Sequence, residues 1–224
     1  MIFFDIDGTL LNHEQAEHLA AKQFYHQHVQ ALEYSEDRFL KLWPQLSHKY
    51  FTHFLNHQLS FQQQRRMRMK DLFSYDISDE KADCLFNKYL SLYKRNWKMF
   101  DDVMNCLEQL KQHGHRLGII SNGAYEQQVD KLQTIGIETF FELIITSDQV
   151  GVSKPNARIF EHACRKAQVK ASYCYYIGDQ LESDAIASQS AGFKGIWINR
   201  KPNEHQTNLP VIGHLQKLMP IILG

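Results

Sequence analysis

The sequence predicts an α/β protein with a parallel sheet covered by helices on both faces, interrupted by a helical domain. Short apolar runs alternate with helical segments of roughly ten residues from Phe100 onward, which is typical of strands joined by crossover helices. Residues 12–98 interrupt this pattern and contain no glycine and no convincing strand. We therefore expect a core of residues 1–11 and 99–224, with residues 12–98 inserted as a small all-helical cap.

Five apolar runs bounded by turn residues predict the strands of the sheet. They cover residues 2–5, 117–120, 143–145, 174–177 and 195–198. The helices expected in the core cover residues 102–112, 125–134, 157–167, 183–191 and 211–219. The polar stretch 203–210 is expected to form a surface loop.

In the inserted domain, residues 14–30 have the apolar spacing of a helix. Serines are expected to cap the beginnings of three further helices: Ser35, Ser60 and Ser78. Gln63 follows Ser60 at the spacing of a capping box. Pro44 either starts a new helix as its first residue or kinks the helix that Ser35 begins.

The composition is that of a globular protein, with 224 residues of which 43% are hydrophobic and 22% charged. Lysine plus arginine and aspartate plus glutamate each number 25, so no overall charge favours nucleic acid or an acidic membrane as a partner. The four cysteines form no C-x-x-C pair, and no segment has the pattern of a signal peptide or a membrane span. We expect a soluble, cytoplasmic protein.

Two aspartates, Asp5 and Asp7, follow the first strand and are succeeded by a Gly8-Thr9 turn. Asp-Gly is also a hairpin signal, but a hairpin needs a second alternating strand, and the residues after Leu11 are polar and helical. Open parallel sheets bind their ligands at the carboxyl ends of the strands. The two carboxylates are therefore expected to lie where a ligand would bind.

Polar residues also follow the later strands. They are Ser121 and Asn122, then Lys154 and Pro155, then Gly178, Asp179 and Asp184. Because parallel strands all point the same way, these clusters are expected to converge on one edge of the sheet. Taken singly, Lys154 has the character of a surface lysine, and Asp184 that of a first-turn residue that complements a helix dipole.

Together, these side chains suit phosphoryl transfer through an enzyme carboxylate. A carboxylate that attacks a phosphate dianion is repelled by it, and Mg²⁺ held by Asp5 and Asp179, with support from Asp184, would offset that repulsion. Ser121 and the amides that open the next helix can hold phosphate oxygens, and Lys154 adds a positive charge. An aspartate two residues beyond the nucleophile can protonate the leaving alcohol and then activate water.

The same residues resemble the four signature motifs of the haloacid dehalogenase-like hydrolases, and they occur in the order of that family. The matching strings are Asp5-Ile6-Asp7-Gly8-Thr9, Ser121-Asn122-Gly123, Lys154-Pro155 and Gly178-Asp179-x-x-x-x-Asp184. The stretches 150–155 and 191–200 are similar to that family as well, as is a helical cap inserted directly after the first motif. The resemblance covers the whole core and, by position and helical character, the cap.

The resemblance implies a Rossmann-like three-layer core and a role for each motif residue. Asp5 would be the nucleophile and Asp7 the general acid and base. The Asp5 carboxylate, the Asp7 backbone carbonyl and Asp179 would ligate Mg²⁺, and Asp184 would support the metal site. The remaining motif residues would bind the substrate phosphate: Ser121, Asn122, Lys154 and Thr9.

We therefore expect a Mg²⁺-dependent phosphatase that hydrolyses a small phosphomonoester, such as a nucleotide or sugar phosphate, through an aspartyl-phosphate. Dehalogenases of the family lack the second aspartate of the first motif, so Asp7 favours a phosphatase over a 2-haloacid dehalogenase. A non-catalytic binding protein that kept the fold is a further alternative, against which the intact motif residues argue. The sequence does not indicate the oligomeric state.

Two groups of side chains in the inserted domain were weighed as possible sites. His53 and His57 have the i, i+4 spacing of a metal-binding pair but no third ligand of known position, which favours an ordinary surface or core role. The basic run of residues 65–70 is expected to be a solvated helix face. If the cap contacts a second anionic group of a substrate, the arginines of this run are the first candidates.

Overall fold

The computed structural model describes the chain except residues 74, 202–206 and 224. The chain divides into two compact units. We call the first the core unit, formed by Met1–Asn12 and Lys98–Gly224, and the second the helical unit, formed by His13–Trp97. Within the core unit, the two segments that lead to the helical unit are hydrogen-bonded, since Asn12 N donates to Lys98 O over 2.9 Å.

Within the described residues, six parallel strands form one sheet in the order β3-β2-β1-β4-β5-β6. Their bounds are Ile2–Phe4 (β1), Leu117–Ser121 (β2), Leu143–Thr146 (β3), Tyr175–Gly178 (β4), Lys194–Ile198 (β5) and Val211–Ile212 (β6). Phe4 of β1 lies opposite Ile119 of β2 and Ile177 of β4. The predicted parallel sheet is confirmed, and β1 lies in its interior.

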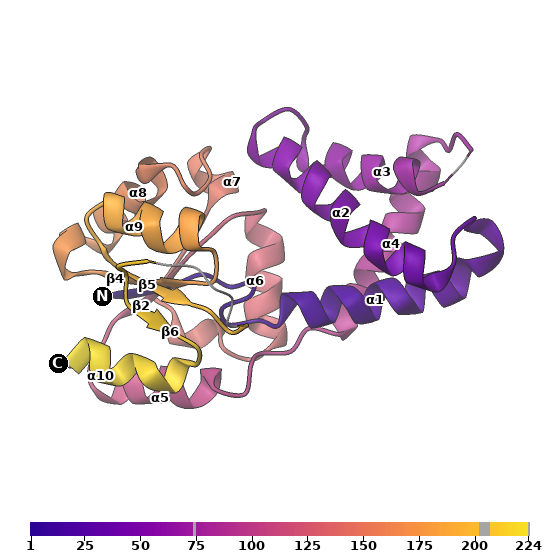
Figure 1. Cartoon of the computed structure of the whole chain (residues 1–224). Helices are drawn as coiled ribbons and strands as arrows, with labels where there is room; N and C mark the ends of the chain where they lie inside the picture. Colours follow the sequence, from indigo (N-terminus) through magenta and orange to yellow (C-terminus); the bar gives the residue numbers. More distant parts are fainter. Residues whose placement is uncertain (74, 202–206, 224) are drawn as a thin grey trace. The chain divides into compact units, whose positions relative to one another are not determined.

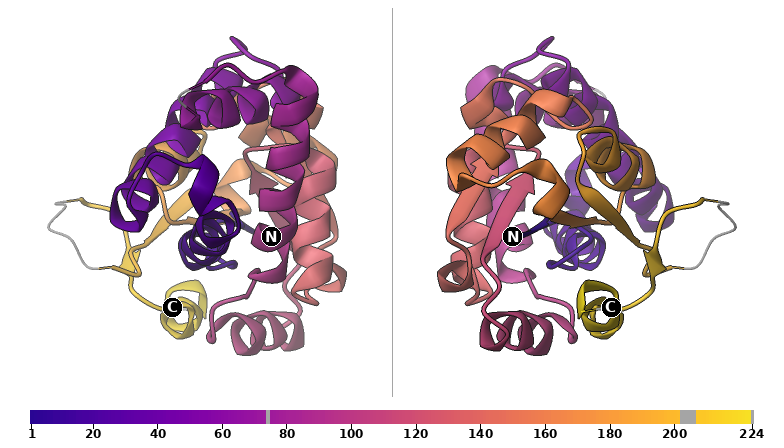
Figure 2. Two further views of the ribbon diagram at one scale, coloured as in Figure 1. Left: turned by 90° about the vertical axis from the view of Figure 1, so that its right-hand side faces the viewer. Right: turned by 90° about the vertical axis from the view of Figure 1, so that its left-hand side faces the viewer.

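Helices cover both faces of this sheet, as predicted for a three-layer α/β core. Their bounds are Val103–Gln112 (α5), Tyr125–Thr134 (α6), Ser147–Val150 (α7), Ala157–Ala167 (α8), Ala187–Ser190 (α9) and Leu218–Leu223 (α10). Helices α8 and α9 lie together on one face, and α5 and α10 lie together on the other (Figure 1). The pairing of α10 with α5 is also seen from the two sides (Figure 2). Beneath α8, the rings of Phe160 and Tyr176 meet edge to face with their centroids 5.2 Å apart.

The C-terminal segment differs from the prediction. The helix expected over residues 211–219 is wrong, because Val211–Ile212 forms β6 and the helix begins only at Leu218. The strand is held to β5 and the residue after it by two hydrogen bonds, from Trp197 N to Pro210 O (3.0 Å) and from Asn199 N to Ile212 O (2.8 Å). Such long-range pairing overrides a weak local preference. The predicted loop over 203–210 lies partly outside the described residues.

The helical unit contains four α-helices within its described residues. Their bounds are His13–His28 (α1), Glu36–Leu55 (α2), Phe61–Leu72 (α3) and Asp79–Arg95 (α4). The three serine caps are confirmed, and the capping box of Ser60 and Gln63 is complete. Pro44 lies inside α2, so a new helix at Pro44 is the wrong alternative. None of the helices described is long and apolar enough to cross a lipid bilayer.

Aromatic side chains form the interior of the helical unit and explain why α2 continues through Pro44. Phe39 and Trp43, which lie one turn apart on the same face of α2, are fully buried. The Trp43 ring lies 4.4 Å from that of Tyr89 on α4, and the Phe39 ring lies 6.4 Å from that of Phe24 on α1. Burial of large rings outweighs the loss of one helical hydrogen bond. These aromatic residues therefore form the core of the helical unit.

Candidate active site

The loop after β1 brings the Asp5 carboxylate to the carboxyl edge of the sheet. Asp5 extends the pairing with β4 by donating its backbone N–H to Ile177 O (2.9 Å). The chain then turns at Gly8, whose φ of +80° is a left-handed conformation that side chains disfavour. A Cβ at Gly8 would also clash with the carboxylate of Asp179. Glycine therefore permits both the turn and the approach of Asp179 to the loop.

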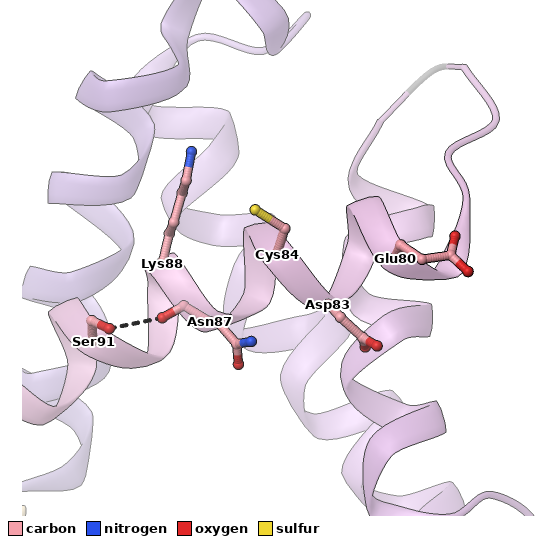
Figure 3. Close-up of a pocket in the computed structure, with 6 residues that line it drawn as sticks. All are labelled: Glu80, Asp83, Cys84, Asn87, Lys88 and Ser91. Carbon is pink, nitrogen blue, oxygen red and sulfur yellow. Dashed lines mark hydrogen bonds between the residues drawn. The ribbon is translucent and has the colours of Figure 1, made fainter.

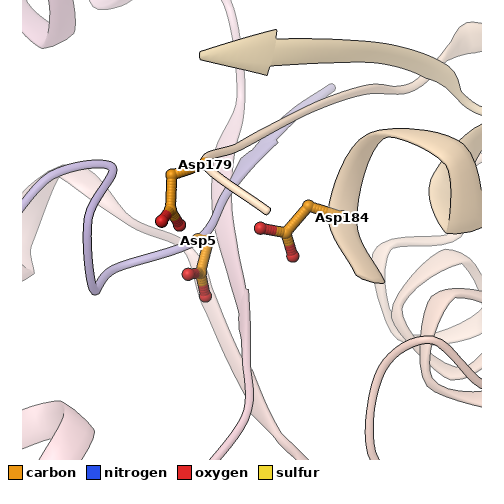
Figure 4. Close-up of side chains that lie close together, drawn as sticks. All are labelled: Asp5, Asp179 and Asp184. Atoms are coloured by element: carbon orange, nitrogen blue, oxygen red, sulfur yellow. The ribbon is translucent and has the colours of Figure 1, made fainter. Parts of the chain in front are cut away.

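Three aspartates converge at this edge: Asp5, Asp179 and Asp184 (Figure 4). One carboxylate oxygen from each lies within 4.8 Å of the others. Burial, opposed by Lys154 and reinforced by Asp184, raises the pKa of Asp5 from 3.8 to about 6. Burial, together with the neighbouring carboxylates of Asp5 and Asp184, raises the pKa of Asp179 well above its usual range. Among the described residues, Asp179 Oδ1 is buried and accepts no hydrogen bond.

Lys154 is the cation that pairs with two of these carboxylates, those of Asp5 and Asp184. Its Nζ lies 2.9 Å from Asp5 Oδ1 and 2.6 Å from Asp184 Oδ1, and it also donates to the Tyr176 hydroxyl (2.8 Å). Burial acts to lower the pKa of Lys154, but Asp184 and Asp5 raise it above its ordinary value. Lys154 is therefore a buried ammonium group, not the surface lysine that its isolated sequence position indicates.

Asn122 and Ser121 follow β2 and have different surroundings. The Asn122 amide is bonded to the backbone of Lys154, accepting from Lys154 N (2.8 Å) and donating to Lys154 O (3.1 Å). Ser121 is buried, and its Oγ accepts a hydrogen bond from Gln128 Nε2 (2.8 Å). Asn122 thus fixes the lysine-bearing loop, while the Ser121 hydroxyl hydrogen remains available for another acceptor.

Asp184 is presented by a π-helical turn, Leu181–Ile186, which leads into α9. The helix expected over 183–191 is present, and its first part is π-helical. The Asp184 carboxylate accepts from the backbone N–H of Gln180 (3.0 Å) as well as from Lys154, and these bonds anchor the turn. A Cβ at Gly178 would clash with Asp184, so the glycine before Asp179 makes room for it. Single π-helical turns occur frequently at functional sites.

Asp7 is held by residues of α6 that sequence reasoning missed. Lys131 Nζ lies 2.8 Å and 2.6 Å from the two Asp7 carboxylate oxygens, and Gln128 Nε2 lies 3.3 Å from Oδ2. Lys131 and Gln128 are both buried and stand at i, i+3 on one face of α6. In the sequence they are ordinary polar residues of an amphipathic helix. The only signal that points to them is that this helix directly follows Ser121 along the chain.

Thr9, the last residue of the first motif, is completely buried. Its carbonyl accepts a hydrogen bond from Arg200 Nη2 (2.7 Å), and Arg200 also binds Asp102 through Nη1 (2.9 Å) and Nη2 (3.0 Å). Arg200 and Asp102 are a second pair that the sequence did not reveal. They anchor the backbone of the first motif from inside the core unit.

The basic run on α3 is only partly the solvated face that was predicted. Arg66 and Lys70 form partly exposed ion pairs with Asp79 of α4, over 2.6 Å and 2.7 Å. Arg68 contradicts the prediction, because it is buried, donates to Ser47 Oγ (2.9 Å) and lies over the Phe86 ring. Its guanidinium is less strongly hydrated than an ammonium group and can stack on an aromatic face inside a helical bundle.

His53 lies in the last turn of α2, and His57 follows that helix in a left-handed conformation, exposed. In the part of the chain that the structure describes, neither histidine joins a group with enough ligands for a metal. A hollow of about 650 Å³ borders α4 (Figure 3). It is lined by Glu80, Asp83, Cys84, Asn87, Lys88 and Ser91. None of these residues belongs to the motif clusters.

The sequence model described as haloacid dehalogenase-like hydrolase matches residues 2–198. A glyceraldehyde 3-phosphate phosphatase of Methanothermobacter thermautotrophicus is 39% identical over 105 residues, which cover 47% of this chain and 46% of the relative. An N-acylneuraminate-9-phosphatase of Mus musculus is 25% identical over 94% of this chain and 86% of its own length. The chain spans about half the length of the first curated relatives it matches.

A solved structure with a similar fold is the HAD-hydrolase YfnB of Bacillus subtilis bound to magnesium. It is 24% identical to this chain, covers 100% of it and 98% of its own length, and superposes with a TM-score of 0.84. This similarity confirms the Rossmann-like α/β fold with its helical insertion.

Proposed function

Because the chain belongs to the haloacid dehalogenase-like hydrolases, we propose that it is a Mg²⁺-dependent phosphatase of small phosphomonoesters. The observation that carries this proposal is a pair of carboxylates with different surroundings. Asp5 lies in a buried acidic cluster beside Lys154, and Asp7 lies close enough to raise the pKa of Asp5. These different surroundings support a role for Asp5 as nucleophile and for Asp7 as the group that exchanges protons.

The acidic cluster fits a divalent cation. Asp179 Oδ1 is buried without a donor among the described residues, and Asp5 and Asp184 share the one ammonium group of Lys154. Asp5, Asp179 and the backbone carbonyl of Asp7 would hold Mg²⁺, and Asp184 would support the site. Mg²⁺ supplies charge that offsets the repulsion between the attacking carboxylate and the substrate phosphate.

In the first step, an Asp5 carboxylate oxygen attacks phosphorus and the bond to the ester oxygen breaks. Asp7 donates a proton to that oxygen, so a neutral alcohol leaves and an aspartyl-phosphate remains. In the second step, Asp7 removes a proton from the water that attacks phosphorus. Inorganic phosphate is released and Asp5 is regenerated.

Lys154 and Ser121 would bind the phosphoryl oxygens during both steps. Since the Ser121 oxygen accepts from Gln128, its hydroxyl hydrogen is free to be donated to a phosphate oxygen. Asn122, bonded twice to the Lys154 backbone, would act by positioning Lys154. Thr9 was expected to bind substrate, but its burial supports a role in holding the first motif.

Asp7 also distinguishes the phosphatase from a 2-haloacid dehalogenase, whose carboxylic ester intermediate forms without protonation of an alcohol. A binding protein would gain nothing from a buried carboxylate cluster with raised pKa values. We favour a nucleotide or sugar phosphate as substrate, since the two relatives named above are phosphatases of small phosphorylated metabolites. The four cysteines are free thiols, which supports a cytoplasmic location.

Phosphate release from 4-nitrophenyl phosphate and from a panel of sugar phosphates and nucleotides would test the proposal. We expect turnover with Mg²⁺, none with EDTA, and none for Asp5→Asn, which keeps the size of the side chain but removes the nucleophile. Asp101→Asn is the matched control, because Asp101 is an exposed aspartate of the same unit. Folded protein that releases no phosphate from any ester in Mg²⁺ would refute the phosphatase, and chloride release from 2-haloacids would then support the dehalogenase.

A further inference from the structure

The α6 helix carries two buried polar side chains that point at the first-motif loop. Lys131 has a side chain that is 5% exposed, and Gln128 is 2% exposed. Burying a lysine is costly unless its ammonium group is paired. Here the ammonium contacts both oxygens of Asp7, at 2.8 Å and 2.6 Å, from a residue 124 positions away in the chain. The interaction therefore fixes the direction of one particular carboxylate.

Gln128 links this carboxylate to the residues after β2. Its Nε2 lies within hydrogen-bonding distance of Ser121 Oγ (2.8 Å), Asn122 O (3.0 Å) and Asp7 Oδ2 (3.3 Å), so its two N–H groups serve three acceptors. One amide nitrogen thus contacts the proposed proton-transfer residue and the proposed phosphate-binding hydroxyl. Lys131 and Gln128 therefore hold the Asp7 carboxylate and the Ser121 hydroxyl in position.

We propose that Lys131, assisted by Gln128, is the positioning residue that aims the Asp7 carboxylate at the ester oxygen of the substrate. The inference rests on the proposed phosphatase function and adds to it a residue outside the four motifs. Lys131 acts through Asp7 and does not itself touch the phosphate. Proton transfer depends steeply on geometry, since a misplacement of about 1 Å can lower a rate about 100-fold.

The leaving group provides the test, because general acid catalysis matters most when the departing alkoxide is basic. The slope of log kcat/KM against leaving-group pKa would be measured for a series from 4-nitrophenyl phosphate through phenyl phosphate to glycerol phosphate. For Lys131→Met we expect about a 3-fold loss with 4-nitrophenyl phosphate and about a 30- to 100-fold loss with glycerol phosphate. Lys131→Arg, whose guanidinium can contact both Asp7 oxygens, should restore most of the wild-type slope.

Two further variants separate positioning from support of the fold. Lys111→Met removes an exposed lysine of the same unit and should leave the slope unchanged. In an Asp7→Asn background, Lys131→Met should change the burst of 4-nitrophenol release less than 2-fold, because the residue through which Lys131 acts is gone. If Lys131→Met does not fold, Lys131→Gln takes its place in both measurements.

Equal losses across the substrate series, a gain of activity, or an additional loss in the Asp7→Asn background would each overturn the inference. Failure of the phosphatase proposal is distinct from these outcomes, because the wild-type protein would then release no phosphate from any ester of the series. An active wild type with an unchanged slope in Lys131→Met refutes the positioning role alone.

Discussion

Two buried acidic sites in the core unit have carboxylate pKa values that are shifted in opposite directions. The side chain of Asp102, which precedes α5, has no exposed surface and accepts from both Arg200 Nη atoms and from Leu215 N (2.7 Å). Burial acts to raise the pKa of Asp102, but Arg200 and Leu215 N lower it below 3.8. In the other site, the aspartate cluster described above shares Lys154, and the pKa values of Asp5 and Asp179 are raised.

The difference separates a carboxylate that stabilises the fold from carboxylates that are proposed to hold a cation. A buried carboxylate with matching donors binds protons more weakly when folded, so its ionised form favours folding at neutral pH. Carboxylates that outnumber their donors are destabilising until a cation joins them. The two sites are also connected, because Arg200 donates to Thr9 O in the first motif.

The largest expected effect is the loss of stability when Asp102, the carboxylate whose donors are all matched, is replaced. Asp102→Asn leaves the Arg200 charge buried without its counter-ion, so the free energy of unfolding should fall by about 3–5 kcal/mol. Urea denaturation without Mg²⁺ measures this change. Asp101→Asn, at the neighbouring exposed aspartate, is the control and should change it by less than about 0.5 kcal/mol. A loss of under about 1 kcal/mol for Asp102→Asn, close to the effect of an ordinary surface substitution, would show that the two acidic sites do not differ in this way.

In the aspartate cluster, loss of a carboxylate is expected to raise the free energy of unfolding. Asp179→Asn removes a carboxylate whose charged form is disfavoured by burial and by Asp5, so the metal-free protein at neutral pH should gain unfolding free energy. The same variant should lose the stabilisation that Mg²⁺ gives the wild type. Urea denaturation in EDTA and in Mg²⁺ measures both quantities. Destabilisation of the metal-free Asp179→Asn protein would place Asp179 with Asp102 as a structural carboxylate.

The sequence predicts the acidic cluster well because its geometry follows from topology. Parallel strands end at one edge, so residues directly after β1 and β4, such as Asp5 and Asp179, must approach each other. The Asp102 site could not be predicted in this way. Arg200 and Leu215 reach Asp102 across long sequence separations, and no local pattern distinguishes Asp102 from any aspartate that precedes a helix.

Three other features were missed for related physical reasons. Lys131 is buried by tertiary packing, whereas its helical position alone indicates a solvated side chain. Tyr176 completes an apolar strand pattern, and only the structure reveals that its hydroxyl binds Lys154. The strand β6 has two residues, too few for a period to be recognised, and depends on its neighbour β5 for its hydrogen bonds.

The third expected effect is the pH dependence of Mg²⁺ binding, which tests the aspartate cluster without a substitution. In the metal-free fold the pKa of Asp5 is about 6, against 3.8 for the free side chain. Between these values the folded state binds the extra proton, so unfolding free energy decreases as pH rises through about 6. Mg²⁺ competes with that proton, so its Kd should increase about tenfold per pH unit below pH 6, which corresponds to about 1.4 kcal/mol per unit. Isothermal titration calorimetry between pH 5 and 8 would measure this; a Kd constant over that range would mean that the cation does not displace a proton from Asp5.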